Sequence, residues 1–512
     1  MPSSAPPHRR PTALASAAAS LAGLVAPIAV FVVAAPRVVD GLGRERFGVL
    51  MVVIAMTALV SSMDLGLGAG GVRLIARASG KRDLAAVSEL VREVFTAFAG
   101  LAVLVGGAAL LLAGPVSTLL FGDTSLPPAE IRQAVQLGGF LAAAGFVGAG
   151  VSVLPRGMEA MPFISTMQGL NSTAVWLGAW GLVAHGFGLI AILVWLVGTS
   201  LVMALAFAAW GLYHCPGTSF RPTRQLAHLR TAVAFNAFAF AAQINAALVN
   251  NLDKLLISFV LGPVSVAHYS LVSNVAGKLP MVAAALASFV YPRASHLSIA
   301  DENTPIQDLY VKVSRYLTLV LAPLTVLLLV LAPPALGLWM GEAFAREMAV
   351  PAVVLVAAYA IAAVSVVPSL VFNAMGNSRI GALFSGIAVL LTAVGSLALI
   401  EPLGILGVAL GVLIGMLQGV VYAGLLERSL GLGWFLSRRR FLIQVGVCLG
   451  AQALVLFLAR GSVSGWASLV AVGVLGGSTF FAAWVALGFT NADDRALVQR
   501  IVQRSWRRKS SN

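Results

Sequence analysis

Residues 42–48, Leu-Gly-Arg-Glu-Arg-Phe-Gly, open one long hydrophobic segment, and residues 261–267, Leu-Gly-Pro-Val-Ser-Val-Ala, open another about 219 positions later. In both stretches a Leu-Gly pair is followed, after three residues, by an apolar residue and a small one. A similar offset relates further pairs of sites: Met158–Glu159 and Met375–Gly376, Gly186–Phe187–Gly188 and Gly404–Gly407, and Arg73 and Arg293. The shared offset and order predict a duplicated chain. Duplicated hydrophobic segments with very short connections are typical of transporters, whose pathway lies between the repeats.

The composition places nearly the whole chain in a membrane. Of 512 residues, 59% are hydrophobic and 10% are charged, and the mean hydropathy is +0.94, whereas about a quarter of the residues of a soluble domain are charged. No polar stretch reaches roughly 50 residues, the usual minimum for a folded domain. The net charge of +14 is explained by cationic cytoplasmic loops rather than by nucleic-acid binding. The two cysteines predict no disulfide framework.

The number of hydrophobic segments predicts the architecture. A helix needs about 20 apolar residues to cross a bilayer. The predicted spans are 14–36, 44–66, 93–113, 133–154, 162–183, 187–212, 230–259, 265–292, 312–338, 348–373, 379–400, 404–427, 440–459 and 464–488. The fold class is therefore all-α: a polytopic membrane protein with about fourteen transmembrane helices. Two parallel six-helix repeats account for the first twelve spans, and two extra helices follow them.

The basic residues predict the orientation, because Lys and Arg are retained in cytoplasmic loops. With the N-terminus inside, roughly 25 of the 33 basic residues fall on the cytoplasmic side. Both termini are then cytoplasmic. The expected division is a cytoplasmic N-terminus (1–13), an N-lobe (14–212), an inter-lobe loop (213–229), a C-lobe (230–427), two further helices (428–488) and a basic cytoplasmic tail (489–512).

Polar residues inside spans seven and eight are the main candidates for substrate contacts. Span seven carries Asn236, Gln243 and Asn250 at intervals of seven residues, and Lys254 follows four residues later. Span eight carries Asn274 and Lys278, also four residues apart. On a helical period each set shares one face. Two polar stripes that end in a lysine indicate a wet cavity, although amides also join membrane helices to one another.

Other charged residues at span ends complete the candidate site. Arg37, Arg73 and Arg293 are candidates for phosphate contacts, because a guanidinium binds phosphate through two hydrogen bonds. Asp64 and Asp253 are the candidates for ion coupling, since an intramembrane carboxylate is expensive and commonly functional. For Asp64, a purely structural role at the end of a helix is an equal alternative.

Several chemistries are missing from the sequence. Ala276–Gly277–Lys278 is followed by Leu279 and lacks the first glycine of a nucleotide-binding loop. The six histidines are scattered and show no metal-ligand spacing. The loops carry no paired carboxylates for acid–base catalysis. We therefore expect a transporter and not an enzyme, with no cofactor and no metal.

Several motifs are similar to those of a known family. Residues 40–48, with Asp64–Leu65–Gly66–Leu67–Gly68, resemble the first two helices of the oligosaccharide flippases. Residues 251–256, Leu261–Gly262, Tyr269 and Tyr291–Pro292–Arg293 resemble that family's seventh and eighth helices, and residues 373–378 its connection between helices ten and eleven. These flippases are the O-antigen and polysaccharide exporters of the multidrug/oligosaccharidyl-lipid/polysaccharide superfamily. The resemblance covers about residues 14–430.

The resemblance implies two six-helix lobes around a central cavity, and it also implies a substrate and a location. An undecaprenyl-diphosphate-linked oligosaccharide would move by alternating access from the inner to the outer leaflet of a bacterial inner membrane, for lipopolysaccharide O-antigen or another surface polysaccharide. A polysaccharide polymerase and a chain-length regulator are the implied protein partners. Span one has no charge before Arg37, unlike the lipid II flippases, which carry several arginines there. This difference disfavours a peptidoglycan precursor as substrate.

Two alternatives from other functional classes stay open. The first is a cation-coupled multidrug antiporter of the same superfamily, which requires an acidic ion site such as Asp64 or Asp253. The second is a membrane scaffold for a polysaccharide synthase that transports nothing itself. A scaffold has no need of polar stripes around a central cavity.

Overall fold

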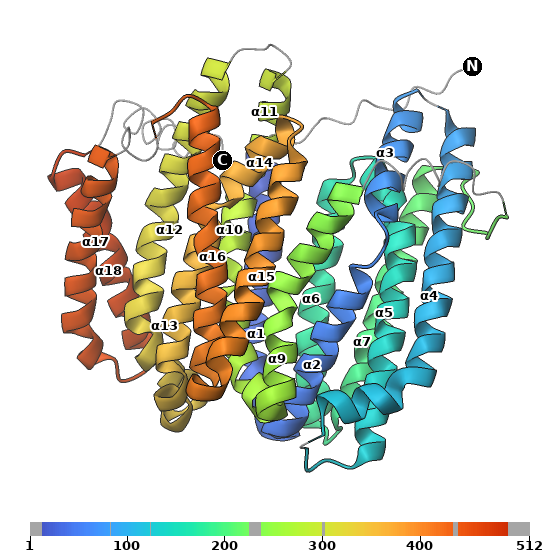
Figure 1. Cartoon of the computed structure of the whole chain (residues 1–512), viewed down its shortest axis with the longest axis horizontal. Helices are drawn as coiled ribbons and strands as arrows, with labels where there is room; N and C mark the ends of the chain where they lie inside the picture. The colour runs from blue at the N-terminus through green and yellow to red at the C-terminus, as the bar shows by residue number, and fades with distance from the viewer. Residues whose placement is uncertain are drawn as a thin grey trace, which may run out of the picture. The chain divides into compact units, whose positions relative to one another are not determined.

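The computed structural model describes residues 13–81, 83–122, 124–224, 237–298, 303–433 and 439–489, and within these ranges the ordered elements are helices (Figure 1). The chain divides into two compact units. One comprises Met1–Val313 and Val350–Ala423, and the other comprises Ser314–Ala349 and Gly424–Asn512. Helices are the expected solution for such an apolar chain, because a backbone in hydrocarbon must satisfy its own hydrogen bonds.

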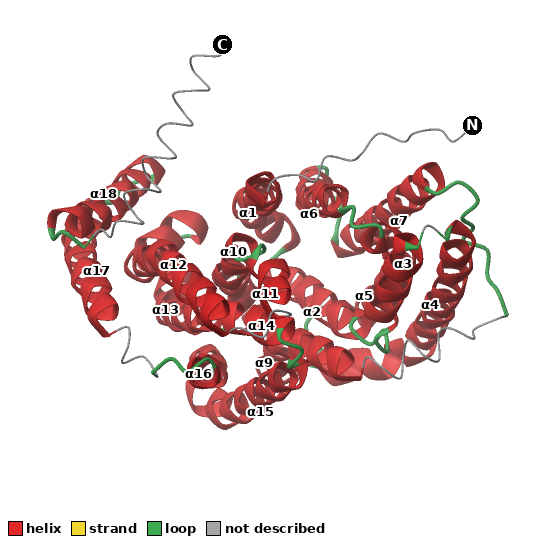
Figure 2. Cartoon of the chain, turned by 90° about the horizontal axis from the view of Figure 1, so that it is seen from above, coloured by secondary structure: helices red, strands yellow, loops and turns green. Residues whose placement is uncertain are grey.

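The first half of the chain forms seven helices in the larger unit. They are α1 (Ala13–Leu42), α2 (Arg44–Ser61), α3 (Leu67–Gly80), α4 (Leu84–Leu120), α5 (Pro128–Gly157), α6 (Met161–Ala184) and α7 (Leu189–His214). Helix α1 packs along α6, and α5 packs between α4 and α7. Figure 2 shows α1 and α6 side by side. Buried side chains of α3, α4 and α5 form one apolar core around Phe98 and Phe146.

The second half continues with helices that are more often interrupted. They are α9 (Ala237–Ala276), α10 (Lys278–Leu286), α11 (Val290–Ser298), α12 (Asn303–Met340), α13 (Glu342–Val364), α14 (Val366–Ala374), α15 (Ser378–Leu403) and α16 (Ile405–Ser429). Helix α9 is broken at Gly262, whose φ of 78° and ψ of 174° are not helical. Span eight was expected as one helix over 265–292. In the structure these residues are divided among the end of α9, α10 and α11.

The smaller unit ends with two helices, α17 (Arg439–Ala459) and α18 (Trp466–Ala486), which pack against each other. Cys448, Phe480 and Trp484 lie in their shared core. The amide of Gln452 donates to the backbone oxygen of Pro323 in α12 at 2.9 Å. This hydrogen bond joins α17 to a helix that contains a proline.

Ten helical segments are long and apolar enough to cross a membrane, among the residues that the structure describes. The protein is therefore a multi-pass membrane protein, but the predicted count of fourteen is not confirmed. Residues 240–286 count as one of the ten although they are broken at Gly262, where the sequence predicted parts of spans seven and eight. Helices α1, α2 and α6 are not among the ten; α2 begins with three charged residues, and α6 carries several polar side chains.

The backbone shows the same special conformations in both halves. Left-handed residues occur in pairs with nearly equal spacing along the chain: Gly43 (φ 83°) and Gly262 (φ 78°), Glu159 (φ 58°) and Gly376 (φ 80°), Gly186 (φ 80°) and Gly404 (φ 58°). Each pair falls at a break between helices, and each includes a site matched by the repeat in the sequence. The agreement of backbone geometry with sequence spacing supports a structural duplication.

The two halves meet along α2 and α9, which pack extensively against each other. A Cβ atom at Gly48 would lie 1.8 Å from the backbone oxygen of Pro263, so only glycine allows this approach. Farther along, Gln243 Nε2 donates to the backbone oxygen of Ser62 at 3.3 Å. The two helices therefore run antiparallel and stay in contact from the start of α2 to its end.

We expect Gly48→Val to destabilise the protein by about 1–3 kcal/mol, because the new side chain meets backbone that cannot move aside. The thermal midpoint of the detergent-purified protein measures the effect. Gly107→Val in α4 is the matched control, since no atom lies within 4 Å of a Cβ at Gly107. Equal midpoints for the two variants would contradict a close contact at Gly48.

The segment after α7 is attached to α4. Ser88 Oγ donates to the backbone oxygen of Gly217 at 3.0 Å, and the backbone N–H of Thr223 donates to Thr96 Oγ1 at 2.8 Å. Cys215 is 2% exposed, and burial raises the pKa of its thiol. Cys215 is thus a poor target for a thiol reagent, whereas Arg224 is exposed.

We expect Arg224→Cys, in a chain with Cys215→Ser and Cys448→Ser, to be labelled by a membrane-impermeant maleimide only after the cells are permeabilised. The expectation follows from the cationic loops, which are retained in the cytoplasm. Labelling in intact cells would reverse the proposed orientation. The cysteine-free parent shows the background.

Candidate substrate cavity

A polar cavity of about 540 Å³ lies among α1, α6, α7, α9 and α10. Both halves of the chain contribute to it within the larger unit. The lining comprises Pro27, Ile28, Phe31, Ser165, Gln168, Gly169, Asn171, Ser172, Trp176, Met203, Asn274, Lys278 and Met281. This is the kind of concave site, with a few converging polar groups, that commonly binds a ligand.

One wall of the cavity is cationic and comes from the second half. Lys278 begins α10, and Asn274 lies one helical turn earlier at the end of α9. Lys278 is partly buried, and no ion pair or hydrogen bond connects its ammonium group to the part of the chain that the structure describes. A cation in such a position is available to an anionic ligand.

Another part of the lining is neutral and comes from α6. Ser165, Gln168 and Ser172 follow one another at intervals of three and four residues, so they share one face of the helix. Asn171 lies beside them. Amide and hydroxyl groups both donate and accept hydrogen bonds, which suits a ligand that carries many hydroxyl groups.

Aromatic residues border the cavity toward the Leu42 end of α1. The rings of Phe31 and Trp176 meet edge to face at a centroid distance of 4.7 Å. Beyond them, the guanidinium of Arg37 lies 4.7 Å from the ring centroid of Trp180, and Arg37 Nη1 donates to the backbone oxygen of Val33 at 2.7 Å. Arg37 is exposed and does not line the cavity.

Asp253 and Lys254 form a separate buried cluster in α9. Asp253 is 0% exposed and Lys254 is 8% exposed. The hydroxyl of Tyr269 donates to Asp253 Oδ2 at 2.5 Å, and the Lys254 ammonium lies 3.5 Å from Asp253 Oδ1. Lys254 Nζ also donates to the backbone oxygen of Asn250 at 2.6 Å. Lys254 is thus held by partners inside the protein and does not line the cavity with Lys278.

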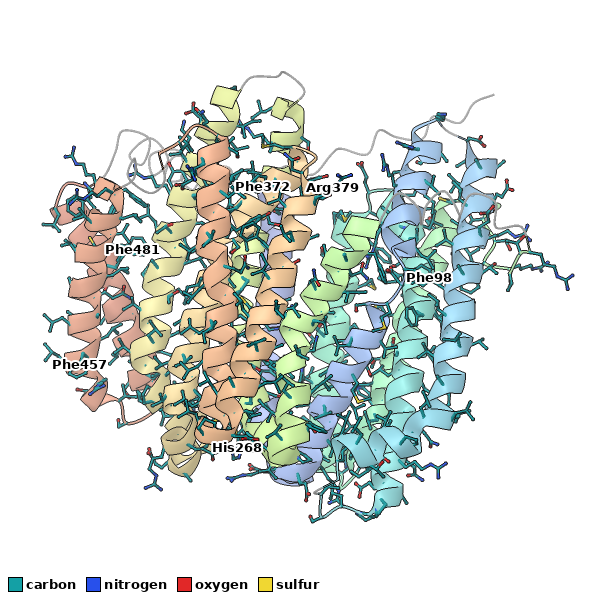
Figure 3. The ribbon with its side chains drawn as sticks, viewed as in Figure 1. Phe98, His268, Phe372, Arg379, Phe457 and Phe481 are labelled. Atoms are coloured by element: carbon teal, nitrogen blue, oxygen red, sulfur yellow. The ribbon has the colours of Figure 1, made fainter. Side chains whose placement is uncertain are left out.

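Tyr359 also lies near this carboxylate, and the residue before Tyr269 is buried as well. The Tyr359 side chain, from α13, is buried and close enough to interact with the charge of Asp253. His268 is 5% exposed and adjoins Tyr269 in the part of α9 that follows Gly262 (Figure 3). The cluster therefore combines a carboxylate, a lysine and two phenols in a region that excludes water.

Two predicted amides of span seven bond to backbone and do not line the cavity. Gln243 joins α9 to Ser62 at the end of α2, as described above, which matches the alternative in which polar side chains join membrane helices. Asn250 instead donates to the backbone oxygen of Ala246 in its own helix at 2.6 Å. Asn236 lies outside the described residues.

Asp64 lies in the break between α2 and α3, where the sequence predicted a continuous span to residue 66. Its carboxylate accepts hydrogen bonds from the backbone N–H groups of Gly66 at 2.9 Å and Gly68 at 3.1 Å. Such bonds satisfy the unpaired N–H groups at the start of a helix. Arg73 in α3 and Arg293 in α11 are exposed, away from the cavity lining.

The structure thus brings together only two of the predicted substrate residues, Asn274 and Lys278. It adds α6, whose polar residues were not predicted although their spacing of three and four residues was visible in the sequence. Tyr269 was noted only as part of the family resemblance. Its contact with Asp253 depends on the break at Gly262, which folds the two parts of α9 against each other.

Comparison with known proteins gives a family and a fold. A family model described as polysaccharide biosynthesis protein matches residues 16–298, more than half of the chain. The lipid II flippase MurJ, in an inward closed conformation, superposes with a TM-score of 0.73 and 13% identity over 92% of this chain and 98% of that chain. No curated protein matches the chain.

Multidrug transporters have the same fold. An inward-facing multidrug resistance MATE family transporter of the MOP superfamily has a TM-score of 0.67 and 14% identity, over 80% of this chain and 98% of the transporter. An outward-facing conformation of such a transporter has a TM-score of 0.52 and 14% identity, over 82% of this chain and 97% of the transporter. These identities are low, so the likeness shows a shared fold. It confirms the predicted all-helical membrane architecture.

We expect Asp64→Ala to destabilise the protein by about 0.5–2 kcal/mol, the usual loss when a helix cap is removed. Asp64→Asn is the matched variant, because its amide oxygen still accepts a hydrogen bond at the start of α3. Thermal midpoints in detergent should therefore rank wild type and Asp64→Asn above Asp64→Ala. An equal loss of thermal stability in both variants would instead show that the negative charge of Asp64 stabilises the protein.

Proposed function

Because the chain belongs to the polysaccharide biosynthesis protein family, we propose that it is a flippase for undecaprenyl-diphosphate-linked oligosaccharides. It moves them by alternating access from the inner to the outer leaflet of the bacterial cytoplasmic membrane, with both of its termini in the cytoplasm. The observation that carries the proposal is the cavity, whose lining combines a cation with amides and hydroxyls. A polymerase and a chain-length regulator are the partners that this role implies.

The cavity addresses the main physical barrier to flipping. Sugar hydroxyls and a diphosphate cannot enter hydrocarbon without losing their hydrogen bonds to water, at several kcal/mol for each polar group. Lys278 offers a cation and three donors to the diphosphate. Ser165, Gln168, Asn171 and Ser172 offer hydrogen bonds to the sugar. The cavity thereby replaces part of the water that the head group loses.

The same lining disfavours the antiporter alternative. Recognition of a cationic drug requires an acidic group at the site, but no carboxylate lines this cavity among the described residues. Asp253 is buried beside Lys254 and Tyr269 instead. A scaffold that transports nothing would have no use for a polar cavity between repeats. The fold likeness to multidrug transporters keeps the antiporter as the second candidate.

We expect Lys278→Met to weaken diphosphate binding roughly ten- to hundred-fold, the usual effect of losing a hydrogen bond to a charged group. The probe is undecaprenyl diphosphate that carries a fluorescent N-acetylglucosamine, with the protein in nanodiscs. Lys278→Arg retains the charge and should retain most of the binding. Unchanged affinity in Lys278→Met would contradict a role for this lysine with the diphosphate.

Asp253 is the better candidate for energy coupling. A buried carboxylate can bind a proton or a sodium ion, and its occupancy can favour one access state over the other. Tyr269 supplies a second oxygen at the same position. Asp64, in contrast, is occupied with two backbone N–H groups at the start of α3.

We expect Asp253→Asn to impair flipping in proteoliposomes more than Asp64→Asn does. Specifically, it should remove the acceleration produced by an imposed pH or sodium gradient, because the substitution removes the titratable charge. Tyr269→Phe retains the carboxylate and should retain a response to the gradient. If wild-type flipping does not depend on either gradient, flow of the lipid down its own concentration gradient is the better account.

A further inference from the structure

A large apolar groove adjoins the polar cavity. It lies between α6 and α7 and has a volume of about 800 Å³. Asn171 and Met203 line both the groove and the polar cavity, so the two spaces meet at these side chains. Beyond Asn171, the polar side chains in the groove are few, and Thr199 already donates its hydroxyl to the backbone oxygen of Leu196 at 3.0 Å.

The packing of α6 explains why this side of the cavity is open. Helix α6 packs closely along α1 and more sparsely along α7. Trp195 of α7 bridges the two helices, because its indole N–H donates to the backbone oxygen of Ala174 at 3.1 Å and its ring lies against Gly178. Val194 and Val202 are more than half exposed along the groove. An apolar groove with an exposed rim is suited to a hydrocarbon chain.

Resting on the proposed function, we propose that this groove holds the polyprenyl chain of the lipid whose head group occupies the polar cavity. A single molecule with a charged end and a hydrocarbon end requires polar and apolar surfaces that adjoin, and the shared residues Asn171 and Met203 provide that junction. The hydrocarbon chain then remains beside the bilayer while the diphosphate reaches Lys278. Because lipid tails are as apolar as the groove, van der Waals packing against its side chains, and not removal from water, stabilises the bound chain.

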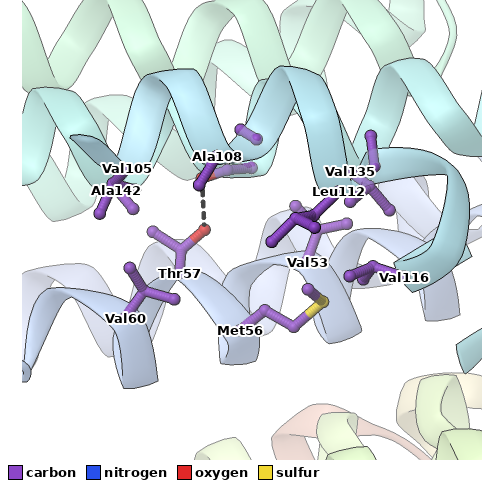
Figure 4. A pocket seen from close by; sticks show the side chains of 14 residues that line it. Val53, Met56, Thr57, Val60, Val105, Ala108, Leu112, Val116, Val135 and Ala142 are labelled. Carbon is purple, nitrogen blue, oxygen red and sulfur yellow. Dashed lines mark hydrogen bonds between the residues drawn. The ribbon is translucent and has the colours of Figure 1, made fainter. Parts of the chain in front are cut away.

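Another apolar pocket lacks this connection. It lies among α2, α4 and α5, has a volume of about 260 Å³ and includes Val53 and Leu112 (Figure 4). It shares no lining residue with the polar cavity. A chain attached to a head group in the polar cavity is therefore assigned to the groove between α6 and α7.

Gly198 offers a way to fill the groove without disturbing the packing. It lines the groove, and no atom lies within 4 Å of a Cβ at this position. Gly198→Phe should therefore fold and occupy space that the chain needs. Gly107→Phe is the matched control, since Gly107 is an exposed helical glycine of α4 with equally open surroundings and lines neither cavity.

The test compares two probes on proteins in nanodiscs: N-acetylglucosamine diphosphate attached to an undecaprenyl chain, and the same head group on a short citronellyl chain. We expect Gly198→Phe to weaken binding of the undecaprenyl probe about ten-fold, because the new ring takes the place of packing contacts that the chain makes in the groove. Binding of the citronellyl probe should be unchanged, and Gly107→Phe should match wild type for both. A photoreactive undecaprenyl probe should label α7 near Val194 and Val202.

Other results would overturn the assignment. If wild type binds both probes equally well, or if Gly198→Phe leaves the preference for the long chain intact, the chain lies elsewhere and the proposed function still stands. Labelling of other helices in place of α7 would also show that the chain lies elsewhere. Equal weakening of both probes by Gly198→Phe would show an effect on the head group and not on the chain. If wild type binds neither probe, the proposed function fails and the groove assignment fails with it.

Discussion

The structure depends on a single constraint: a backbone surrounded by hydrocarbon must bond to itself, so a helix in the membrane can be interrupted only where the chain compensates. Several interruptions in this protein occur at left-handed residues such as Gly43 and Gly262, and another occurs where a side chain takes over the backbone bonds, as Asp64 does before α3. Their placement determines which helices can pack. The break at Gly262 lets both parts of α9 enclose Asp253.

The two lysines that looked equivalent in the sequence differ in how their charges are compensated. Lys254 lies beside Asp253 and bonds to the backbone of its own helix, so its charge is compensated within the protein. Lys278 lies at the first residue of α10, next to a cavity. A buried ion pair is held in place because removing one partner leaves the other uncompensated. A cation beside a cavity can instead exchange partners as a ligand arrives and leaves.

Much of the fold could be predicted from the sequence, and less of the site. Hydrophobic segments and the Leu-Gly repeats predicted helices and their connections because those features are local. The exact spans were harder, since a break such as the one at Asp64 occupies only a few residues. The roles of Gln243 and Asn250 could not be predicted. Amides recur at the same intervals along a helix whether they line a cavity or bond to protein backbone. The α6 wall was missed because short polar side chains in a hydrophobic segment usually indicate helix packing.

The division of the cavity walls between the two halves has a consequence for how the duplicated halves diverged. The cation comes from α10 in the second half, whereas the α6 amides and hydroxyls come from the first. If the halves were identical, each would present both a cationic surface and a surface of amides and hydroxyls. This chain instead presents a cationic surface from one half and a neutral hydrogen-bonding surface from the other. A ligand with a diphosphate at one end and a sugar at the other, as proposed above, would contact a different half with each end and would therefore bind in one orientation.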